Sequence, residues 1–272
     1  MVKRKRANND KHLNASHDVS RQELKARILA YPRWYHSFQL DGETKIMGWA
    51  EQNQAYPETA FAEQDFQYYQ LPKDWSNKTV LDVGGWDGAI SFEMERRGSN
   101  KVVLVNPYSL SDIDLPIQGE GTLEYFEQIY REKGYPLKEI HSGGALLLIE
   151  WFQSSIIILY STVYDLPTKV QHPFDLVLFL GLLYHLRDPI RGLEAASKVT
   201  KELLILETMC FPEDDPLAHD QRSYCEFLGC DKGQNWWIFN YHAIEHMLGV
   251  NGFRHIERKS TWRHRCVYHA YK

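Results

Sequence analysis

The stretch VLDVGGWDGAISFE, from Val80 to Glu93, holds the residues whose types and spacing most suggest chemistry. An apolar run typical of a buried strand leads into closely spaced glycines, and a helical pattern follows. Parallel α/β proteins bind nucleotide-containing cofactors at such strand-to-helix turns. Gly84 would allow a sharp exit from the strand, and Gly88 would allow the helix to pack closely.

The composition of this turn distinguishes between two cofactors. A dinucleotide-binding turn has the pattern G-x-G-x-x-G. Here Gly84 and Gly85 are adjacent, and Trp86 stands where the middle glycine is expected. The Trp86 side chain would obstruct a pyrophosphate lying along the backbone. Asp82 adds a carboxylate, which is unfavourable beside phosphate and favourable beside a sulfonium or amino group. The turn therefore favours S-adenosylmethionine over NAD.

Two further motifs make the resemblance more specific. The pattern D-x-G-x-x-x-G resembles the glycine loop of class I S-adenosylmethionine-dependent methyltransferases. Gly181–His185 (GLLYH) and Leu206–Thr208 (LET) follow in order, at the ends of two predicted strands. Together they resemble the family that includes the tRNA wobble-uridine carboxymethyltransferase. The resemblance covers about residues 30–272 and is strongest over 78–106 and 155–210.

This resemblance implies a set of cofactor contacts beyond the glycine loop. Asn106 directly follows the second predicted strand, at the position where an acidic residue usually binds the ribose hydroxyls, and an asparagine can still exchange hydrogen bonds with a diol. Val163 and Tyr164 follow the third strand and are expected to face the adenine. Leu180 and Gly181 end the fourth strand and are expected to lie against the cofactor.

The acceptor is expected near the same edge of the sheet. Tyr184 and His185 would approach it, and His185 could serve as a general base because histidine titrates near neutrality. Structural roles for both side chains stay open at this point. Two aromatic segments could complete the acceptor site, since neighbouring tryptophans can stack on a flat molecule. Their candidate residues are Trp34, Tyr35, His36, Trp236, Trp237 and Asn240.

The family also includes enzymes that use a carboxylated cofactor. The resemblance implies that two cations would hold the extra carboxylate, one of them a lysine that follows a tryptophan. His36 is the nearest counterpart of that lysine, and Arg265 fits the position of the second cation, an arginine. Only one of the two is thus retained. Ordinary S-adenosylmethionine is therefore expected, and carboxy-S-adenosylmethionine is the less favoured alternative.

The elements that must position these residues alternate along the chain. Apolar strands separated by amphipathic helices predict an α/β fold, with a doubly wound, seven-stranded and mostly parallel sheet of the Rossmann-like class I methyltransferase type. The last two strands are expected to be antiparallel at one edge. The predicted strands are 79–83, 101–105, 155–161, 174–180, 202–208, 253–259 and 265–271.

The remaining segments suggest three parts of the chain. Residues 1–20 read as a disordered basic tail, 21–75 as an N-terminal helical and aromatic extension or lid, and 76–272 as the methyltransferase domain. A hairpin turn is expected at Asp41–Gly42. The stretch from 210 to 240 reads as a long aromatic loop.

Composition bounds the function. The net charge of −5 gives no global basic field, although a local patch for tRNA remains open. No apolar run reaches the roughly 18 residues of a membrane span, and four cysteines without a C-x-x-C pair fit a reducing cytoplasm. The H-x-x-E-H sequence at His242–His246 lies on a predicted amphipathic helix, so no metal is expected there.

The sequence therefore predicts an S-adenosylmethionine-dependent methyltransferase that acts on a small-molecule acceptor. Two alternatives stay open. One is a tRNA wobble-uridine (carboxy)methyltransferase, and the other is a non-catalytic, methyltransferase-like binding subunit.

Overall fold

The computed structural model describes residues 21–53, 66–119, 121–230 and 234–272 and is built around one seven-stranded sheet. The proposed basic tail, 1–20, lies outside the described residues. The strands follow the order β10-β11-β7-β6-β3-β4-β5. Their bounds are β3 Thr79–Val83, β4 Lys101–Asn106, β5 Ile157–Tyr160, β6 Phe174–Leu180, β7 Thr200–Met209, β10 His255–Trp262 and β11 Arg265–Tyr271.

Five of these strands are parallel, and the last two close one edge. β3 pairs with β4 and β6, β4 with β5, and β6 with β7, all in parallel. β11 lies antiparallel between β7 and β10. This confirms the doubly wound sheet and the antiparallel closing pair that the sequence predicts.

Both faces of the sheet are covered because its strands are apolar on both sides. Leu81 and Leu204 belong to the core on one face, while Val80 and Leu203 belong to the core on the other. Helices α3 (Ala89–Arg96) and α5 (Gly143–Phe152) cover the second face. The first face is covered by α6 (Leu166–Lys169), α7 (Pro189–Lys198) and α9 (Tyr241–Val250).

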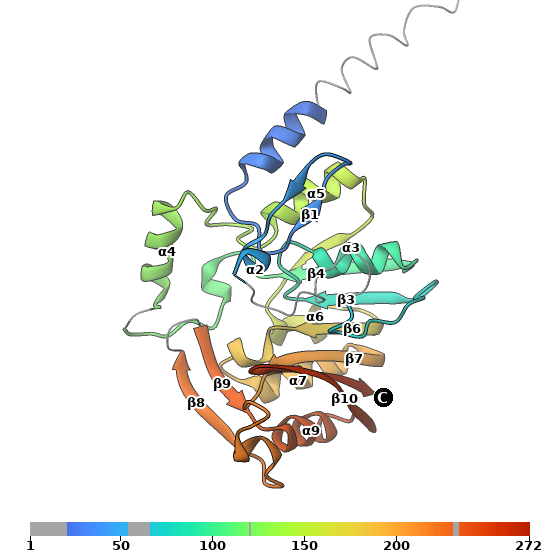
Figure 1. Ribbon diagram of the computed structural model, residues 1–272, viewed down its shortest axis with the longest axis vertical. Coiled ribbons are helices and arrows are strands. Elements are labelled where there is room, and N and C mark those ends of the chain that lie inside the picture. The colour runs from blue at the N-terminus through green and yellow to red at the C-terminus, as the bar shows by residue number, and fades with distance from the viewer. Residues whose placement is uncertain (1–20, 54–65, 120, 231–233) are drawn as a thin grey trace, which may run out of the picture.

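The carboxyl ends of the parallel strands face a side of the molecule that carries several additions. Tyr271 of β11 pairs with Leu203 near the start of β7, so the marked C-terminus lies at the amino ends of the parallel strands (Figure 1). The opposite side carries α4 (Leu123–Glu132) and the strands β8 (Cys225–Cys230) and β9 (Asn235–Phe239). Short 3-10 helices η2 (Leu110–Asp112), η3 (Val163–Asp165), η4 (Leu183–His185) and η5 (Pro216–His219) complete the connections.

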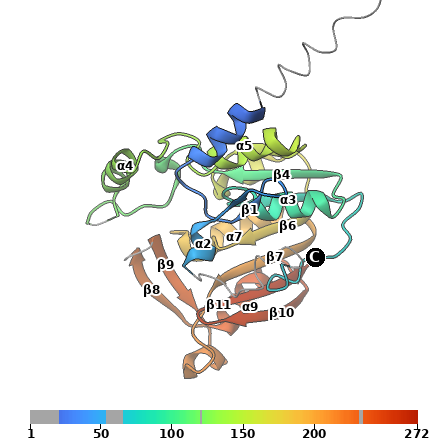
Figure 2. The ribbon, with the colours of Figure 1, turned by 45° about the horizontal axis from the view of Figure 1, so that its top comes forward.

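The N-terminal extension packs on α5 and α3 (Figure 2). Its described part contains a helix over residues 21–30, a hairpin of β1 (Phe38–Gln39) and β2 (Lys45–Ile46), and α2 (Trp49–Gln52). This confirms the predicted hairpin turn. Leu24, Ile28 and Phe38 bury their side chains against α5, and the indole of Trp151 donates a 2.9 Å hydrogen bond to the Leu40 carbonyl.

The expectation of a long loop between residues 210 and 240 is wrong. β8 and β9 form a separate two-stranded antiparallel sheet (Figures 1 and 2), and a bridge between Cys210 and Phe239 joins the end of β9 to the chain just after β7. β9 buries Trp236, Ile238 and Phe239 against the protein, whereas most of β8 stays exposed. The exposed strand carries no alternating apolar pattern, which is why the sequence did not indicate it.

No described helix is long and apolar enough to cross a membrane.

A buried ion pair ties the segment before β3 to α3, and its loss should destabilise the protein. Arg97 pairs with Glu93, and each side chain is 7% exposed. The Arg97 guanidinium also donates hydrogen bonds of 2.9 and 2.8 Å to the carbonyls of Leu71 and Pro72. Arg97→Ala should lower the free energy of unfolding by about 3 kcal/mol, because it leaves a buried carboxylate with less compensation.

Arg96 offers a matched control, since it binds the same Glu93 carboxylate but is 64% exposed. Arg96→Ala should cost less than about 1 kcal/mol. Equilibrium unfolding in urea measures both values. Equal losses for the two variants would contradict the assigned role of Arg97.

Candidate active site

A cavity opens where the parallel strands β3, β4, β5 and β6 end. It is bounded by the glycine loop, by the first residues after β4 and β5, by η4 and by the N-terminal extension. Its lining residues are Tyr35, His36, Tyr69, Asp82, Val83, Gly84, Gly85, Trp86, Ile90, Val105, Pro107, Asp112, Ile113, Asp114, His141, Ser161, Thr162, Val163, Tyr164, Leu180, Gly181, Leu182, Tyr184, His185, Leu186 and Gln234.

Steric limits in the glycine loop explain its composition. Gly84 has φ +75°, and its amide donates a 2.8 Å hydrogen bond to Val105 as the chain leaves the sheet. A Cβ on Gly85 would lie 2.3 Å from Oδ2 of Asp82, so only glycine lets this carboxylate lie beneath the loop. Gly88 has φ +83°, and a Cβ there would approach the side chains of α3 and β4. Asp82, Gly84 and Gly85 line the cavity, and Gly88 does not.

Trp86 adopts a left-handed conformation with φ +57°, which is unusual for a bulky residue. Asn106 holds it there from the end of β4. The Trp86 amide donates to Oδ1 of Asn106 at 3.1 Å, and Nδ2 of Asn106 donates to the Trp86 carbonyl at 2.7 Å. The same Nδ2 donates to the Ser142 hydroxyl at 2.9 Å, so the fully buried amide is used internally.

The expected contact between Asn106 and the ribose is therefore corrected, because this side chain clamps the loop and is absent from the lining. Two acidic residues shortly beyond β4, Asp112 and Asp114, do line the cavity. The hydroxyl of Tyr164 and the amide of Arg187 donate to Oδ2 of Asp114. The position at the end of the strand predicted a ribose contact for Asn106. Asp112 and Asp114 lie in the turn that follows, where no strand pattern indicates which residues face the cavity.

The Trp86 ring organises several neighbours. It stacks on His141 with ring centroids 3.9 Å apart and planes 13° apart. The guanidinium of Arg33 lies 4.4 Å from the centre of the indole, and the Tyr35 ring lies 5.2 Å from it at a tilt of 36°. Burial holds the pKa of His141 well below its usual value, with help from the nearby positive charge of Arg33. His141 is thus a neutral, stacking side chain, and nothing in the sequence around it indicated this role.

Asp87 is a functional candidate that sequence reasoning missed, although it lies in the glycine loop. It is 1% exposed. Its Oδ2 accepts hydrogen bonds from the backbone amides of Tyr35 at 2.9 Å and His36 at 2.8 Å. Its Oδ1 contacts Nδ1 of the His36 ring. The carboxylate thus fastens the extension to the loop and brings two predicted residues, Tyr35 and His36, into the lining.

Trp34 does not join them, which corrects its expected role. Its indole donates to the Ile28 carbonyl at 3.2 Å, and its ring packs edge-on against Tyr31 and Phe38. Trp34 therefore belongs to the packing of the extension on α5.

The opposite wall of the cavity is formed by η4. Burial raises the pKa of the Tyr184 phenol well above its usual value, so it stays protonated. Nη2 of Arg265 donates to the Tyr184 hydroxyl at 3.0 Å, while Nη1 binds both oxygens of the fully buried Glu207 at 2.8 and 3.1 Å. Arg265 lies behind Tyr184 and is absent from the lining, which corrects its expected role as a direct ligand contact.

His185 also lines the cavity as a neutral imidazole. Its Nδ1 lies 2.9 Å from the Gln234 carbonyl, so this nitrogen must carry the proton that it shares. Burial lowers the pKa of His185 to about 4. A base of that strength takes protons weakly near neutral pH. The predicted base role of His185 therefore receives little support from its surroundings.

Asp82 is a buried acid at the bottom of the cavity. Burial raises its pKa to about 6, against the opposing effect of a 2.6 Å hydrogen bond from the Ser91 hydroxyl. The carboxylate is therefore largely ionised at neutral pH and becomes protonated in mildly acidic solution.

The tryptophans of β9 brace the cavity from outside. The indole of Trp236 donates to the Asp114 carbonyl at 2.8 Å, and the Arg187 guanidinium lies 5.1 Å from its ring. Trp237 packs beside Phe227 with ring centroids 5.2 Å apart. Neither side chain lines the cavity, which corrects the expectation that both stack on the acceptor.

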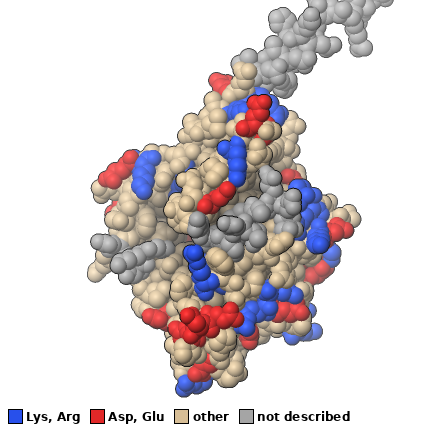
Figure 3. Space-filling model, viewed as in Figure 1, with Lys and Arg blue, Asp and Glu red and all other residues tan. Residues whose placement is uncertain are grey.

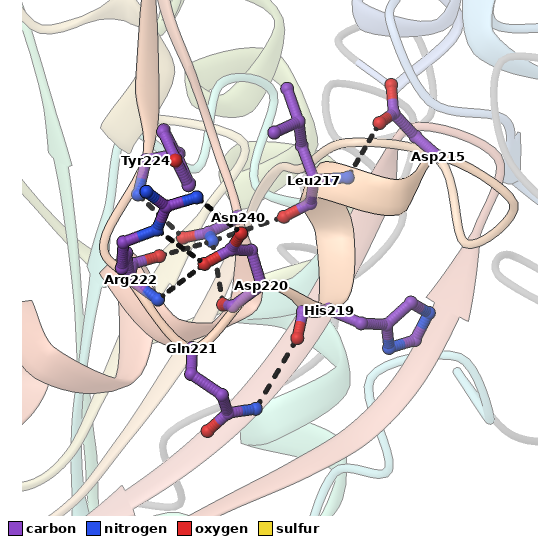
Figure 4. A network of polar contacts seen from close by, with 8 residues as sticks. All are labelled: Asp215, Leu217, His219, Asp220, Gln221, Arg222, Tyr224 and Asn240. Atoms are coloured by element: carbon purple, nitrogen blue, oxygen red, sulfur yellow. Dashed lines mark hydrogen bonds and ion pairs between the residues drawn. The ribbon is translucent and has the colours of Figure 1, made fainter.

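Asn240 is a structural residue, which corrects its expected contact with the acceptor. It caps the start of α9, where its Oδ1 accepts from the amides of Ala243 at 2.8 Å and Tyr224 at 3.0 Å. Its Nδ2 donates to the carbonyls of Leu217, Asp220 and Arg222 (Figure 4). Apart from Ala243, which lies in the first turn of α9, these partners belong to the connection between β7 and β8.

In the described part of the chain, no three His, Cys, Asp or Glu side chains come together as metal ligands, and this includes the H-x-x-E-H segment of α9.

Replacement of Asn240 should test this structural assignment. Asn240→Ala removes a helix cap and leaves three carbonyls without their donor, so the free energy of unfolding should fall by about 2–4 kcal/mol. Asn251, at the other end of α9, donates one bond to Met247 and serves as the control. Asn251→Ala should cost less than about 1 kcal/mol in the same urea titration, and similar losses for the two variants would argue against a network centred on Asn240.

Comparison with known proteins places the fold. No family model matches the sequence, and no curated protein matches it. Among solved structures, the N-terminal domain of EvdMO1 with SAH (S-adenosylhomocysteine) bound is similar, with a TM-score of 0.63 and 17% identity over 92% of this chain and 96% of that chain. The same domain in the presence of SAH and D-fucose gives 0.59 and 18%, over 92% and 95%.

The full EvdMO1 structure gives a TM-score of 0.53 and 18% identity, and the match covers 92% of this chain but 47% of that one. This chain thus spans about half the length of EvdMO1. Three observations point to the same fold: the glycine loop after β3, the order of the seven strands and the similarity to these solved structures. The chain has the Rossmann-like fold of the class I methyltransferases.

Proposed function

We propose that this protein is an S-adenosylmethionine-dependent methyltransferase that acts on a small-molecule acceptor. The charge of the cavity carries the proposal. Among the described residues that line it, Asp82, Asp112 and Asp114 are the acids, and no lysine or arginine is present. Such a lining attracts the sulfonium and amino groups of S-adenosylmethionine and repels the phosphates of a dinucleotide.

The structural neighbours support the choice of cofactor. The N-terminal domain of EvdMO1 holds SAH, the product that remains after S-adenosylmethionine gives up its methyl group. In this chain, the glycine loop with Asp82, Gly84, Gly85 and Trp86 would hold the methionine part. Leu180 and Gly181 at the end of β6 would lie against the cofactor from the adjacent strand.

The adenosine part would lie toward the ends of β4 and β5. Val163 and Ile113 provide apolar surface there, and both line the cavity. The carboxylates of Asp112 and Asp114 can accept hydrogen bonds from the ribose hydroxyls, in place of Asn106. Tyr164, already bonded to Asp114, would stay at the rim of this subsite.

The acceptor would face the wall that η4 and the extension form. Tyr184, His185 and Tyr35 line it, together with Tyr69. Methyl transfer requires mainly that the acceptor be aligned with the methyl carbon and that water be excluded. Aromatic side chains suit both tasks, because they bury a large area and have few rotatable bonds.

Both cation positions that would select a carboxylated cofactor are already engaged. Arg265 pairs with the buried Glu207, and His36 contacts Asp87. An extra carboxylate on the cofactor would find neither side chain without a partner, so ordinary S-adenosylmethionine is the cofactor that we propose. On the face shown in Figure 3, the Lys and Arg side chains of the described residues are interspersed with Asp and Glu. This face therefore shows no continuous basic band of the kind that binds the phosphates of tRNA.

The first experiment is calorimetric titration of the full chain with SAH. We expect binding in the micromolar range and, with S-adenosylmethionine carrying a labelled methyl group, transfer to a member of a panel of sugars, phenols and amines. D-Fucose belongs in that panel because it was present with an EvdMO1 domain. Absence of SAH binding would refute the proposal. Binding of SAH with transfer to tRNA alone would favour the wobble-uridine alternative.

The pH dependence of binding tests the role of Asp82. Its pKa of about 6 means that the carboxylate attracts a cationic ligand above pH 7 and loses its charge as the pH falls through 6. The affinity for S-adenosylmethionine should therefore drop by up to about tenfold between pH 7.5 and 5. His185, with a pKa of about 4, stays neutral over most of that range.

Asp82→Asn should bind about tenfold more weakly at pH 7.5 and lose most of this dependence. Asp74→Asn, at an exposed turn, is the matched control and should behave as the wild type. If Asp82→Asn kept the pH dependence of the wild type, Asp82 would not be the group that recognises the cofactor.

A further inference from the structure

Among the described residues, three histidines line the cavity, and they differ in the group that each imidazole contacts. His141 is stacked on Trp86, and His185 faces a carbonyl. Among the described residues of the lining, His36 is the histidine whose ring contacts a carboxylate, that of Asp87. A histidine oriented by a carboxylate is the arrangement with which proteins make a base of imidazole.

The Asp87 carboxylate is held in place by more than the ring. It accepts the amide hydrogens of Tyr35 and His36 on Oδ2, so its other oxygen is directed at Nδ1 of His36. Hydrogen bonds to a carboxylate favour its charged form. The negatively charged partner requires that Nδ1 of a neutral imidazole carry the proton. A proton from the acceptor can then be taken only by Nε2.

His36 lines the cavity in which the acceptor is proposed to bind. It is 9% exposed and shares the cavity with Asp82, Leu182 and Tyr184. Among the described residues, the charged groups near it include Asp87, in direct contact, and Asp82, which lines the same cavity. The neighbouring ring of Tyr35 lies 4.9 Å away. The contact with the Asp87 carboxylate would stabilise the imidazolium that forms.

We propose that His36, oriented by Asp87, accepts a proton from a hydroxyl group of the acceptor, so that the enzyme is an O-methyltransferase for neutral hydroxylated molecules. The inference rests on the proposed methyl transfer and names its base and its acceptor class. A hydroxyl is a weak nucleophile unless its proton leaves as the new bond forms. An acid-lined cavity without lysine or arginine among the described lining residues favours an uncharged acceptor over an anionic one.

The step balances in atoms and charge. The hydroxyl oxygen attacks the methyl carbon and forms the C–O bond. The bond between that carbon and sulfur breaks, and its electron pair stays on the sulfur of SAH. The hydroxyl proton passes to Nε2 of His36, and the imidazolium then returns it to solvent. Asp87 takes up no proton in this step and acts as a positioning residue.

The experiment first uses ¹⁵N NMR of the imidazoles in the full chain saturated with SAH at pH 8. The His36 signal is assigned by its loss in His36→Asn. We expect Nδ1 to be protonated in the wild type. In Asp87→Asn the amide group would face Nδ1 as a donor and should invert the tautomer, while its oxygen still accepts the backbone amides. Protonation on Nε2 in the wild type, or an unchanged tautomer in Asp87→Asn, overturns the proposal.

The kinetic arm separates a base from a structural residue. In His36→Asn the amide nitrogen replaces Nδ1 and keeps the contact with Asp87, but Nε2 is gone. Both His36→Asn and Asp87→Asn should bind SAH within about threefold of the wild type. With catechol or D-fucose as the probe acceptor, kcat should fall by about 10²–10⁴-fold with little change in KM. His172→Gln, at an exposed position, is the control.

The outcomes distinguish this inference from the proposed function. Loss of SAH binding in the wild type would refute the methyltransferase itself. Normal SAH binding with unchanged kcat in His36→Asn would overturn the base assignment alone, and so would a larger loss in His185→Gln than in His36→Asn. Weakened SAH binding by His36→Asn at an unchanged kcat would make His36 a cofactor contact. Methylation at nitrogen or sulfur would overturn the hydroxyl class.

Discussion

The hydrogen bonds between Asn106 and the backbone of Trp86 fix the geometry on which the rest of the cavity depends. A left-handed tryptophan is about 1 kcal/mol or more less favourable than an ordinary backbone conformation. Asn106 offsets this cost by binding both the amide and the carbonyl of Trp86 from a fully buried position. The indole can then stack on His141, and the next residue, Asp87, turns toward the extension. One amide thus places both an aromatic platform and a carboxylate.

Several titratable side chains around the cavity either contact a partner of opposite charge or are kept neutral by burial. Behind the wall, Arg265 is neutralised by Glu207, and on the other side His36 contacts Asp87. Burial keeps His141 and His185 neutral at physiological pH, as their lowered pKa values indicate. What remains toward the cavity is a set of acids and neutral aromatic groups. That combination would favour the bound sulfonium of the proposed cofactor, while the guanidinium of Arg33 lies against the Trp86 ring and is not part of the lining.

The sequence predicted the elements well because they depend on local patterns. The strand Thr79–Val83 and its glycine turn were recognised from consecutive apolar residues and from backbone needs that only glycine meets. Side-chain roles were harder to predict, because their partners lie far along the chain. The amide of Asn240 binds carbonyls 18 to 23 residues earlier, and Asp87 binds His36 across 51 residues. No spacing rule connects such pairs, so Asp87 was visible in the motif and still went unassigned.

The contacts between Asp87 and the N-terminal extension also determine whether this part of the extension can move. Asp87 is buried, and three of its hydrogen-bonding contacts come from Tyr35 and His36. To lift this part of the extension off the loop would leave an ionised carboxylate without its donors, at a cost of several kcal/mol if it stayed buried. Residues 35 and 36 are therefore better described as a fixed wall than as a moving lid. A fixed wall would hold the proposed base, His36, at a constant distance from the methyl group of the proposed cofactor, and a mobile segment would not.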